Sequence, residues 1–454
     1  MGRRRKKNIV VQIDRLKPKG VSGPIEGRPD VIATVKGASL GDTVLARPAR
    51  KGKATLLEIQ QPSSDRIQPK CPLFLRCGGC QLQHTALETQ RTEKQKMVQR
   101  LINRPDVPFA PMIGTQSGYA YRNKLELSFG TRQYLDAEEH SKGDATVEGD
   151  FLGMHPWGWY SKIVPVPECA LVSDSMNQVL RTLQALELKP AWSNHSHTGV
   201  WRHVVIREGD GLWVTLVTSS EAQRDEMDMV AQKLVACSSE ISGIMWVIND
   251  GLADVATGRL EATLFGSSEM SLTVSEKTFK LPHDAFFQVN TAGTNALIEL
   301  LSSIYDGAKG KLFDLYCGAG TLGIALSAHF NSVLGIEVHE GAIEVARKNA
   351  ALNQVKGEWH AGTVETLLHH LEHTEAAHIL VDPPRVGLHP KAAEKLAQSV
   401  AESLVYVACS PASLARDIPI LEAGGWRLKK VYTVDLFPQT PHVESIAVFS
   451  KEAQ

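Results

Sequence analysis

The stretch "KLFDLYCGAGTLGIALSAH", Lys311–His329, decides the fold of the last third of the chain. It reads as an apolar strand, a glycine-rich turn and an apolar helix. Gly318 and Gly320 in the turn predict a backbone that a ligand approaches closely, because glycine tolerates conformations that other residues avoid. A strand, a glycine turn and a helix in this order are typical of the first unit of a nucleotide-binding α/β sheet.

The segments that follow extend this pattern. Glu337 ends a second apolar strand, about 20 positions after the glycines, where an acidic residue typically takes ribose hydroxyls. Asp314 leads the glycine turn, and Asp382 in "HILVDPPRVGLHP" ends a fourth strand. This ordered set resembles the class I methyltransferases, and the resemblance implies S-adenosylmethionine as the methyl donor. A Rossmann-like domain for another nucleotide is the alternative.

A thiol lies in "SLVYVACSPASLARD", Ser403–Asp417. The apolar run predicts a fifth strand that breaks at Ser410-Pro411, and a helix follows. Cys409 is at the break, and ligands bind at strand ends in open α/β sheets. The residue is therefore a candidate nucleophile, although a buried structural thiol is the common alternative.

Carbon 5 of uracil is an acceptor that would need such a thiol. Addition of a thiolate to carbon 6 makes carbon 5 nucleophilic, so one difficult step becomes several easier ones. A base must then remove the carbon-5 proton, and Glu444 in "TPHVESIAVFSK" is the candidate, 35 residues after Cys409. An ordinary thiol has a pKa of about 8.5, so we expect a cation nearby. Arg385 and Arg416 are close in sequence.

The motifs "DPPRVGLHP", "YVACSPASLARD" and "PHVESIAVF", in this order, resemble the RNA uracil-5 methyltransferases. The resemblance implies that Cys409 is the carbon-6 nucleophile, Glu444 the general base, and Asp382 a contact to the uracil or the cofactor. Thr321 stands where some members have Asn, and Thr363 where many have Asn or Asp. The absence of a thiol in "VDPPR" disfavours cytosine as the acceptor. The implied cofactor-binding residues are Gln288, Tyr316, Gly318, Gly320, Thr321, Glu337, Thr363 and Asp382.

Three of the seven cysteines cluster in "CPLFLRCGGC", as Cys71, Cys77 and Cys80. Cys169 in "VPVPECALVSD" is the best candidate for a fourth ligand. An odd, unevenly spaced set argues against a secreted disulfide framework. Four thiolates suit either zinc or an iron–sulfur cluster, and their spacing leaves both open. Similarity to the 23S rRNA (uracil-5-)-methyltransferases that contain iron–sulfur implies a [4Fe–4S] cluster, with zinc as the alternative.

The amino-terminal segment reads as short strands separated by Gly and Pro, among them "NIVVQID", "DVIATVKG", "DTVLARPA" and "KATLLEIQQ". This spacing predicts a small barrel of the OB type, which the resemblance refines to a TRAM-like domain. Residues 1–100 hold 21 Lys+Arg and 8 Asp+Glu, and the remainder holds 28 and 42. A basic first quarter favours a polyanion such as RNA as the partner. A solvated basic tail and a purely structural barrel are the alternatives.

Together these features predict an α/β protein with a Rossmann-like class I methyltransferase domain at 271–454. A TRAM/OB-like barrel is expected at 1–62, and a central α+β domain with the cysteine segment at 63–270. No apolar run approaches the 18 or so residues of a membrane helix, and no signal core follows the basic start. We therefore expect a cytoplasmic protein without a membrane partner.

The RNA class is the remaining question for the sequence. The cysteine set and the barrel favour 23S rRNA as the substrate, and tRNA is the alternative. A rival interpretation from another class is a catalytically silent RNA-binding protein on the same fold. The presence of Cys409, Glu444 and Asp382 together argues against silence.

Overall fold

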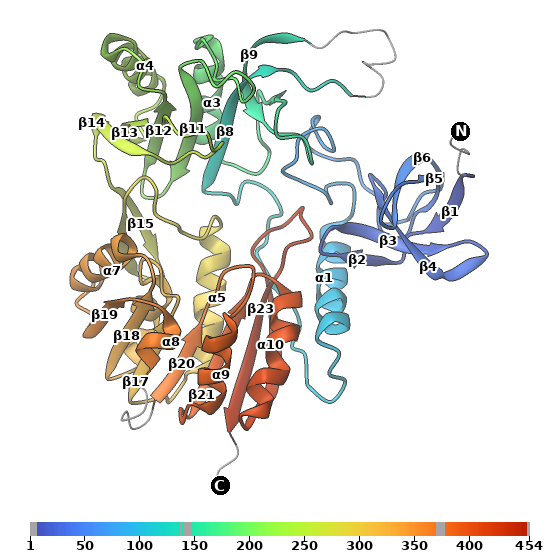
Figure 1. Ribbon diagram of the computed structural model, residues 1–454, viewed down its shortest axis with the longest axis vertical. Coiled ribbons are helices and arrows are strands. Elements are labelled where there is room, and N and C mark those ends of the chain that lie inside the picture. Colours follow the sequence, from blue (N-terminus) through green and yellow to red (C-terminus); the bar gives the residue numbers. More distant parts are fainter. Residues whose placement is uncertain (1–6, 137–138, 140–146, 369–376, 452–454) are drawn as a thin grey trace.

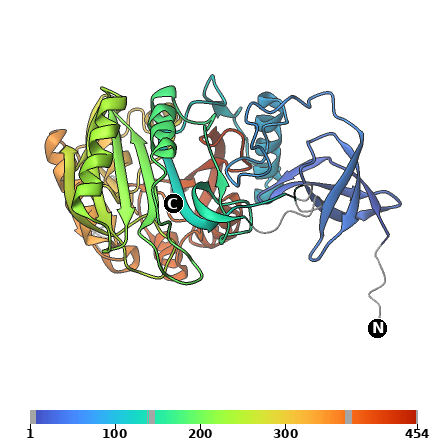
Figure 2. The same cartoon turned by 90° about the horizontal axis from the view of Figure 1, so that it is seen from above.

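The computed structural model describes residues 7–136, 139, 147–368 and 377–451, and the basic run at 1–6 lies outside them. Three sheets and a two-stranded hairpin organise the chain. The middle sheet lies above the last sheet, and the amino-terminal strands lie to one side of both (Figure 1). Figure 2 shows the amino-terminal barrel projecting from one end of the molecule. Among the described residues, no helix has the length and apolar character to cross a membrane.

Six strands form the amino-terminal barrel in the order β1-β5-β6-β4-β3-β2, and β1 also pairs with β3. Alternate side chains such as Val11 and Val44 fill its core. A Cβ at Gly23 would lie 1.6 Å from the carbonyl oxygen of Gln12, so the β1–β3 contact requires glycine there. The strands are β1 (Ile9–Gln12), β2 (Arg15–Lys17), β3 (Gly20–Ile25), β4 (Arg28–Lys36), β5 (Thr43–Pro48) and β6 (Lys53–Gln61).

The middle sheet has the order β10-β9-β8-β11-β12-β13-β14. Only its β12–β13 pairing is parallel, and the helices α3 (Asp174–Ala185) and α4 (Arg224–Cys237) pack against it. Its central strands are buried almost throughout. The strands are β8 (Lys124–Arg132), β9 (Glu148–Met154), β10 (Val164–Pro165), β11 (Trp201–Glu208), β12 (Leu212–Thr218), β13 (Ile241–Ile248) and β14 (Arg259–Gly266).

The last sheet has the order β19-β18-β17-β20-β21-β23-β22-β7, with parallel strands from β19 to β21 and an antiparallel β23. This confirms the predicted Rossmann-like α/β fold. The strands are β17 (Lys311–Leu315), β18 (Ser332–Glu337), β19 (Gly357–Ala361), β20 (Ala377–Val381), β21 (Ser403–Ala408), β22 (Trp426–Asp435), β23 (Glu444–Lys451) and β7 (Ile113–Gly114). β7 lies within residues 63–270, the range expected for the central domain, but it pairs with the last sheet instead.

Helices and a hairpin complete this part of the chain. The hairpin of β15 (Met270–Val274) and β16 (Lys277–Leu281) precedes α5. Short helices connect the parallel strands, as the alternating sequence pattern predicts. The helices are α5 (Thr291–Ile304), α6 (Thr321–Leu326), the 3₁₀ turn η1 (Ser327–His329), α7 (Glu340–Leu352), α8 (Val364–Leu367), α9 (Pro390–Gln398) and α10 (Pro411–Ala423).

The helix α1 (Leu87–Ile102) joins the cysteine segment to the last sheet. Its Lys94 is completely buried, and its Nζ lies 2.6 Å from Oδ1 of Asp435 at the end of β22. Burial lowers the pKa of Lys94, and the charge of Asp435 opposes that effect. A buried ion pair of this kind is costly to break because the remaining charge has no partner.

Candidate active site

The strand register brings Asp382, Cys409 and Glu444 to one edge of the last sheet. Val381 lies opposite Tyr406 in the parallel β20–β21 pair, so Asp382 leaves its strand at the carboxyl edge. Ala408 lies opposite Ser445 in the antiparallel β21–β23 pair. Cys409 follows Ala408 and Glu444 precedes Ser445, so the thiol and the carboxylate are neighbours across the two strands. The antiparallel direction of β23 brings a residue at its start to the carboxyl edge of the parallel strands.

The glycine turn and Glu337 lie at the same edge. Glu337 Oε2 accepts the backbone N–H of Gly318 at 3.3 Å, and its Oε1 accepts that of His339 at 3.0 Å. Gly318 has φ +54°, and a Cβ there would meet no described atom within 4 Å, so its backbone is open to a ligand. A Cβ at Gly320 would lie 3.1 Å from the ring of Trp359. Gly320 therefore serves packing, whereas Gly318 faces the site.

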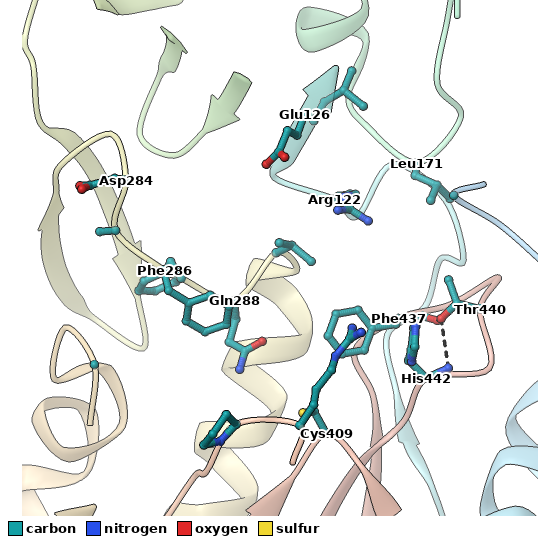
Figure 3. A pocket seen from close by; sticks show the side chains of 18 of the residues that line it. Arg122, Glu126, Leu171, Asp284, Phe286, Gln288, Cys409, Phe437, Thr440 and His442 are labelled. Carbon is teal, nitrogen blue, oxygen red and sulfur yellow. Dashed lines mark hydrogen bonds between the residues drawn. The ribbon is translucent and has the colours of Figure 1, made fainter. Parts of the chain in front are cut away.

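A cavity of about 1640 Å³ opens above this edge. Figure 3 shows Cys409 and Gln288 on one side of it and Arg122 and Glu126 of the central segment on the other. Two predicted cofactor residues are not among its lining residues: Gly320, and Thr363, whose hydroxyl lies 3.0 Å from that of Thr366 at the start of α8. The predicted residues that do line it are Gln288, Tyr316, Gly318, Thr321, Glu337, Asp382, Cys409 and Glu444.

Glu444 is the most unusual group in this cavity. Glu444 is only 1% exposed, and neither of its carboxyl oxygens has a hydrogen-bond partner among the described residues. Burial, and then the charge of Asp382, raises the pKa of Glu444 well above its ordinary value. Burial also raises the pKa of Asp382 to about 7. Because the two carboxyl groups are buried and their charges repel, the protonated forms of Asp382 and Glu444 are favoured near neutral pH.

The Cys409 thiol is half-buried beside these carboxyls. Burial, and then the charges of Glu444 and Asp382, raises its pKa to about 11, whereas Arg385 acts in the opposite direction. Arg385 is thus the cation that favours the thiolate. Arg416 binds Asp417 instead, with 2.7 Å between Nη2 and Oδ1.

The break after Cys409 has a local cause. The Ser410 hydroxyl accepts the backbone N–H of Ser413 at 3.4 Å, and Pro411 occupies the first turn of α10. Serine as the cap and proline in the first turn are preferred at helix starts. The strand therefore ends at Ala408, and Cys409 directly after it lines the cavity.

Among the cavity residues that were not predicted from the sequence, three bear on its chemistry. Phe286 is 75% exposed although it is aromatic, and it lines the cavity beside Gln288. His442 lies two residues before Glu444, and burial lowers its pKa to about 4, so its imidazole is neutral. Arg122 comes from the central segment. The doubled aromatic in "AFFQVN" was the available signal for Phe286, since only one of the two rings is needed for the core.

The four predicted metal ligands, Cys71, Cys77, Cys80 and Cys169, line the same cavity as free thiols. Burial is the main cause that raises the pKa of Cys80 to about 12, and charges on Cys77, Cys169 and Cys71 act in the same direction. The Gly79 N–H donates to Cys77 Sγ at 3.4 Å. The four sulfurs thus line one cavity, and four sulfur donors would suit either predicted group. Within the described ranges, however, no group of three His, Cys, Asp or Glu side chains has a metal-holding arrangement.

The cysteine segment also holds the turn that leads to Glu444. The Gln439 carbonyl accepts the backbone N–H groups of Gln81 at 2.9 Å and Leu82 at 3.0 Å. Gln90 of α1 accepts the Gln439 N–H at 3.0 Å and donates to its side-chain oxygen at 2.9 Å. Gln439 has φ +67°, so these contacts fix a backbone conformation that non-glycine residues rarely adopt.

A parallel sheet with a glycine turn after its first strand, an acid after its second and Asp-Pro-Pro after its fourth defines the class I methyltransferase fold. The family model "tRNA (Uracil-5-)-methyltransferase" matches residues 264–358 and 368–452. An uncharacterised RNA methyltransferase of Clostridium acetobutylicum is 33% identical over 434 residues, covering 92% of each chain. Another from Caldanaerobacter subterraneus subsp. tengcongensis is 30% identical, covering 98% of each. The chain belongs to the S-adenosylmethionine-dependent RNA uracil-5 methyltransferase family.

A solved structure supports the same fold. The crystal structure of Pyrococcus abyssi tRNA (uracil-54, C5)-methyltransferase in complex with S-adenosyl-L-homocysteine aligns with a TM-score of 0.74. It is 23% identical, and the alignment covers 97% of this chain and 100% of that one. At this identity the likeness shows that the fold is shared over nearly the whole chain.

Proposed function

We propose that this enzyme methylates carbon 5 of a specific uridine in RNA through a covalent adduct on Cys409. The observation that carries the proposal is the pairing of Cys409 with Glu444, a buried carboxyl whose oxygens have no partner among the described residues. A carboxyl group left unpartnered in a cavity is costly unless a ligand uses it. Their places at the end of β21 and the start of β23 suit a nucleophile and a base that act on one ring.

The proposed chemistry begins at Cys409. Its thiolate adds to carbon 6 of the uracil, and the electrons of the 5,6 double bond move toward the carbon-4 oxygen. The sulfonium of S-adenosylmethionine supplies the methyl group that carbon 5 then takes, leaving S-adenosylhomocysteine. Glu444 must first lose the proton that its raised pKa favours; as a carboxylate it then removes the carbon-5 proton, the double bond re-forms, and the Cys409 sulfur leaves carbon 6. Because the pKa of the Cys409 thiol is about 11, the thiolate is disfavoured at neutral pH, and the positive charge of Arg385 would stabilise it.

The cofactor end of the cavity is assigned in the same proposal. Glu337 would take ribose hydroxyls, and the open backbone at Gly318 would lie against the cofactor. Gln288, Tyr316 and Thr321 would complete this end, with Asp382 between it and the uracil. The exposed Phe286 ring offers a face for the extruded base, since enzymes that modify a base take it out of its stack.

We further propose that Cys71, Cys77, Cys80 and Cys169 are the ligands of a [4Fe–4S] cluster, with zinc as the alternative. Cys169 would be a well-placed fourth ligand, because Asn177 fixes its backbone by hydrogen bonds of 2.8 Å and 3.1 Å. Such a group would hold the segment that contacts Gln439. Iron analysis and visible absorption of protein purified without oxygen test this. Zinc in place of iron would favour the alternative, and protein with neither, active and stable as isolated, would contradict both.

The substrate class is proposed to be 23S rRNA, on the cysteine set and the basic barrel. Transfer RNA is the alternative, because the family model and the Pyrococcus abyssi enzyme are named for it. The test is methylation of separate, unmodified rRNA and tRNA pools, followed by mass spectrometry of the nucleosides. New 5-methyluridine in one pool identifies the class. No 5-methyluridine in either pool, from folded protein that binds cofactor, would contradict the proposed function.

A covalent trap tests the mechanism. RNA that contains 5-fluorouridine should form a stable adduct, because fluorine at carbon 5 prevents the elimination step. The Cys409→Ala protein should form none. An adduct with the Cys409→Ala protein would assign the nucleophile to another residue.

A further inference from the structure

The loop between β9 and β10 exposes three aromatic rings within four residues. Trp157 is 42% exposed, Trp159 is 56% exposed and Tyr160 is 76% exposed. Folded proteins normally bury most of such rings, and an exposed aromatic group marks an interaction surface. We call Trp157, Trp159 and Tyr160 the aromatic loop.

The aromatic loop is held in place from its other side. The Gly78 N–H donates to the His155 carbonyl at 3.1 Å, and a Cβ at Gly78 would lie 2.7 Å from that oxygen. The His155 ring lies 3.2 Å from Asp254, measured from Nε2 to Oδ2. The loop is therefore fixed against the cysteine segment and the middle sheet while its rings stay exposed. A loop that is anchored in this way and has exposed rings needs little further ordering to bind a ligand.

Two cations accompany the rings. Lys36 of the barrel lies with its Nζ 5.4 Å from the Trp157 ring centre, and Lys162 lies 5.7 Å from that of Trp159. The same Trp157 ring approaches Gly20, so it bridges the barrel and the loop. Rings beside lysines suit a ligand that has both flat apolar groups and negative charge. Single-stranded RNA is such a ligand, because its bases stack on aromatic rings and its phosphates attract cations.

The place of the loop relative to the active site completes the argument. Trp157 and Tyr160 line the cavity that also contains Cys409, and Trp159 lies between them in the loop, outside the cavity lining. An RNA strand that delivers a uridine to Cys409 must continue along the cavity wall on at least one side of that base. We propose that Trp159 and Tyr160 stack on unpaired bases that flank the target uridine, with Trp157 as the anchor of the loop. This inference rests on the proposed function, and it adds a single-stranded substrate to it.

The test compares Trp159→Ala/Tyr160→Ala with the matched Trp159→Phe/Tyr160→Phe protein, which keeps flat rings. The probe is a fluorescein-labelled oligouridylate of about 12 nucleotides, alone or paired with its complement, at one fixed salt concentration. The alanine variant should lose on the order of tenfold or more in affinity for the single strand. Its affinity for the duplex should stay unchanged, and the phenylalanine variant should bind the single strand nearly as the parent does. Val400→Ala removes an exposed apolar side chain outside the cavity lining and should change nothing.

Several outcomes would overturn the stacking surface. One is an unchanged affinity of the alanine variant for the single strand, and another is an equal loss for the duplex. A third is binding to anionic phospholipid vesicles that the alanine variant loses while it retains the oligonucleotide. Thermal melting and S-adenosylhomocysteine binding, both expected to match the parent, exclude misfolding as the cause of a loss.

The assay of rRNA and tRNA pools separates the two proposals. If the parent protein forms no 5-methyluridine but its oligonucleotide affinity depends on the two rings, the proposed function fails and the stacking surface stands. If the parent methylates RNA and the alanine variant binds the single strand equally well, the stacking surface fails and the proposed function stands.

Discussion

The cavity has two walls that are built by different means. The catalytic wall consists of Asp382, Cys409 and Glu444 at the ends of neighbouring strands, placed by the register of one sheet. The loop wall consists of residues of the cysteine segment 71–83, Cys169, and Trp157 and Tyr160 of the aromatic loop, placed by contacts between segments far apart in sequence. The catalytic wall has a buried carboxyl, that of Glu444, without a hydrogen-bond partner in the part of the chain that the structure describes, whereas the loop wall exposes its rings. Strands hold catalytic side chains in a precise geometry, whereas loops present side chains that contact the larger substrate.

The largest expected effect comes from changes within the catalytic wall. Cys409→Ala should abolish methylation, whereas Glu444→Gln should slow it by about 10²- to 10⁴-fold, the usual contribution of a general base. The two variants should differ in the adduct: Glu444→Gln should accumulate a covalent RNA complex even with ordinary uridine, because its carbon-5 proton stays in place. Gel analysis of denatured complexes measures this. A Glu444→Gln protein that turns over at the parent rate, or a Cys409→Ala protein that forms adduct, would remove the distinction between nucleophile and base.

The next largest effect concerns the buried ion pair between α1 and the end of β22. Lys94→Ala removes the nearer of two cations beside the fully buried Asp435 carboxylate and leaves only Arg91, whose Nε lies 3.6 Å from Oδ2. The free energy of unfolding should therefore fall by about 3 kcal/mol. Urea denaturation measures the loss. Lys96→Ala on the same helix is the matched control, since the Lys96 side chain is 55% exposed and its partner Glu93 keeps a contact of 3.8 Å with Arg100, so the loss should cost about 1 kcal/mol or less. Equal stability of the two variants would mean that water reaches Asp435 and that the ion pair contributes little to the free energy of unfolding.

The same contrast explains which parts could be predicted from the sequence. Strands β1, β4, β5 and β6 were predicted because Gly and Pro separate short apolar runs, whereas β2 and β3 were not predicted, because Gly20, Gly23 and Pro24 are typical of turns. Gly23 is needed by a neighbouring strand in the folded barrel, and a one-dimensional pattern contains no such information.

The site follows the same rule. Asp382, Cys409 and Glu337 were predictable because strand ends in a parallel sheet share one edge. Thr363 was expected near the cofactor, but it lies at the start of α8, outside the cavity lining. The contacts of Gln439 with α1 and the cysteine segment could not be predicted, because they join residues about 350 positions apart, as the bond between Gln90 and Gln439 illustrates. The order of the middle sheet was open for the same reason, since most of its pairings depend on packing rather than on local pattern.

A smaller effect concerns the stability of the catalytic wall with pH. Burial raises the pKa of Asp382 from an ordinary 3.8 to about 7, so its contribution to stability is complete below pH 3.8 and is lost as pH rises through 7. Asp382→Asn removes that titration. The variant should be more stable than the parent at pH 8 by on the order of 2 kcal/mol, and should gain less at pH 5. Its methylation rate should nevertheless fall.

Urea denaturation at the two pH values measures this, with the exposed Asp306→Asn as control. Some pH dependence should remain in Asp382→Asn, because burial raises the pKa of Asp314 to about 7 as well. A variant that is less stable than the parent at pH 8 would show that the Asp382 carboxylate has a stabilising partner in the folded protein.

The smallest effect should come from the contact by which α1 and the cysteine segment hold the turn before Glu444. Gln90→Ala removes the hydrogen bonds to the backbone and the side chain of Gln439, together with those that the Gln90 amide donates to the Leu82 and Thr85 carbonyls, at a cost to stability of about 2 kcal/mol. Gln90 is a positioning residue, so kcat should fall by roughly tenfold while the KM for S-adenosylmethionine stays unchanged, because the turn leads to the base and not to the cofactor. Gln99→Ala, exposed on the same helix, is the matched control and should match the parent in both. Slower release of the RNA adduct by Gln90→Ala would link the loss to proton removal by Glu444. A rise in KM with unchanged kcat would instead mean that α1 acts on cofactor binding, and the loop wall would then serve the substrates rather than the base.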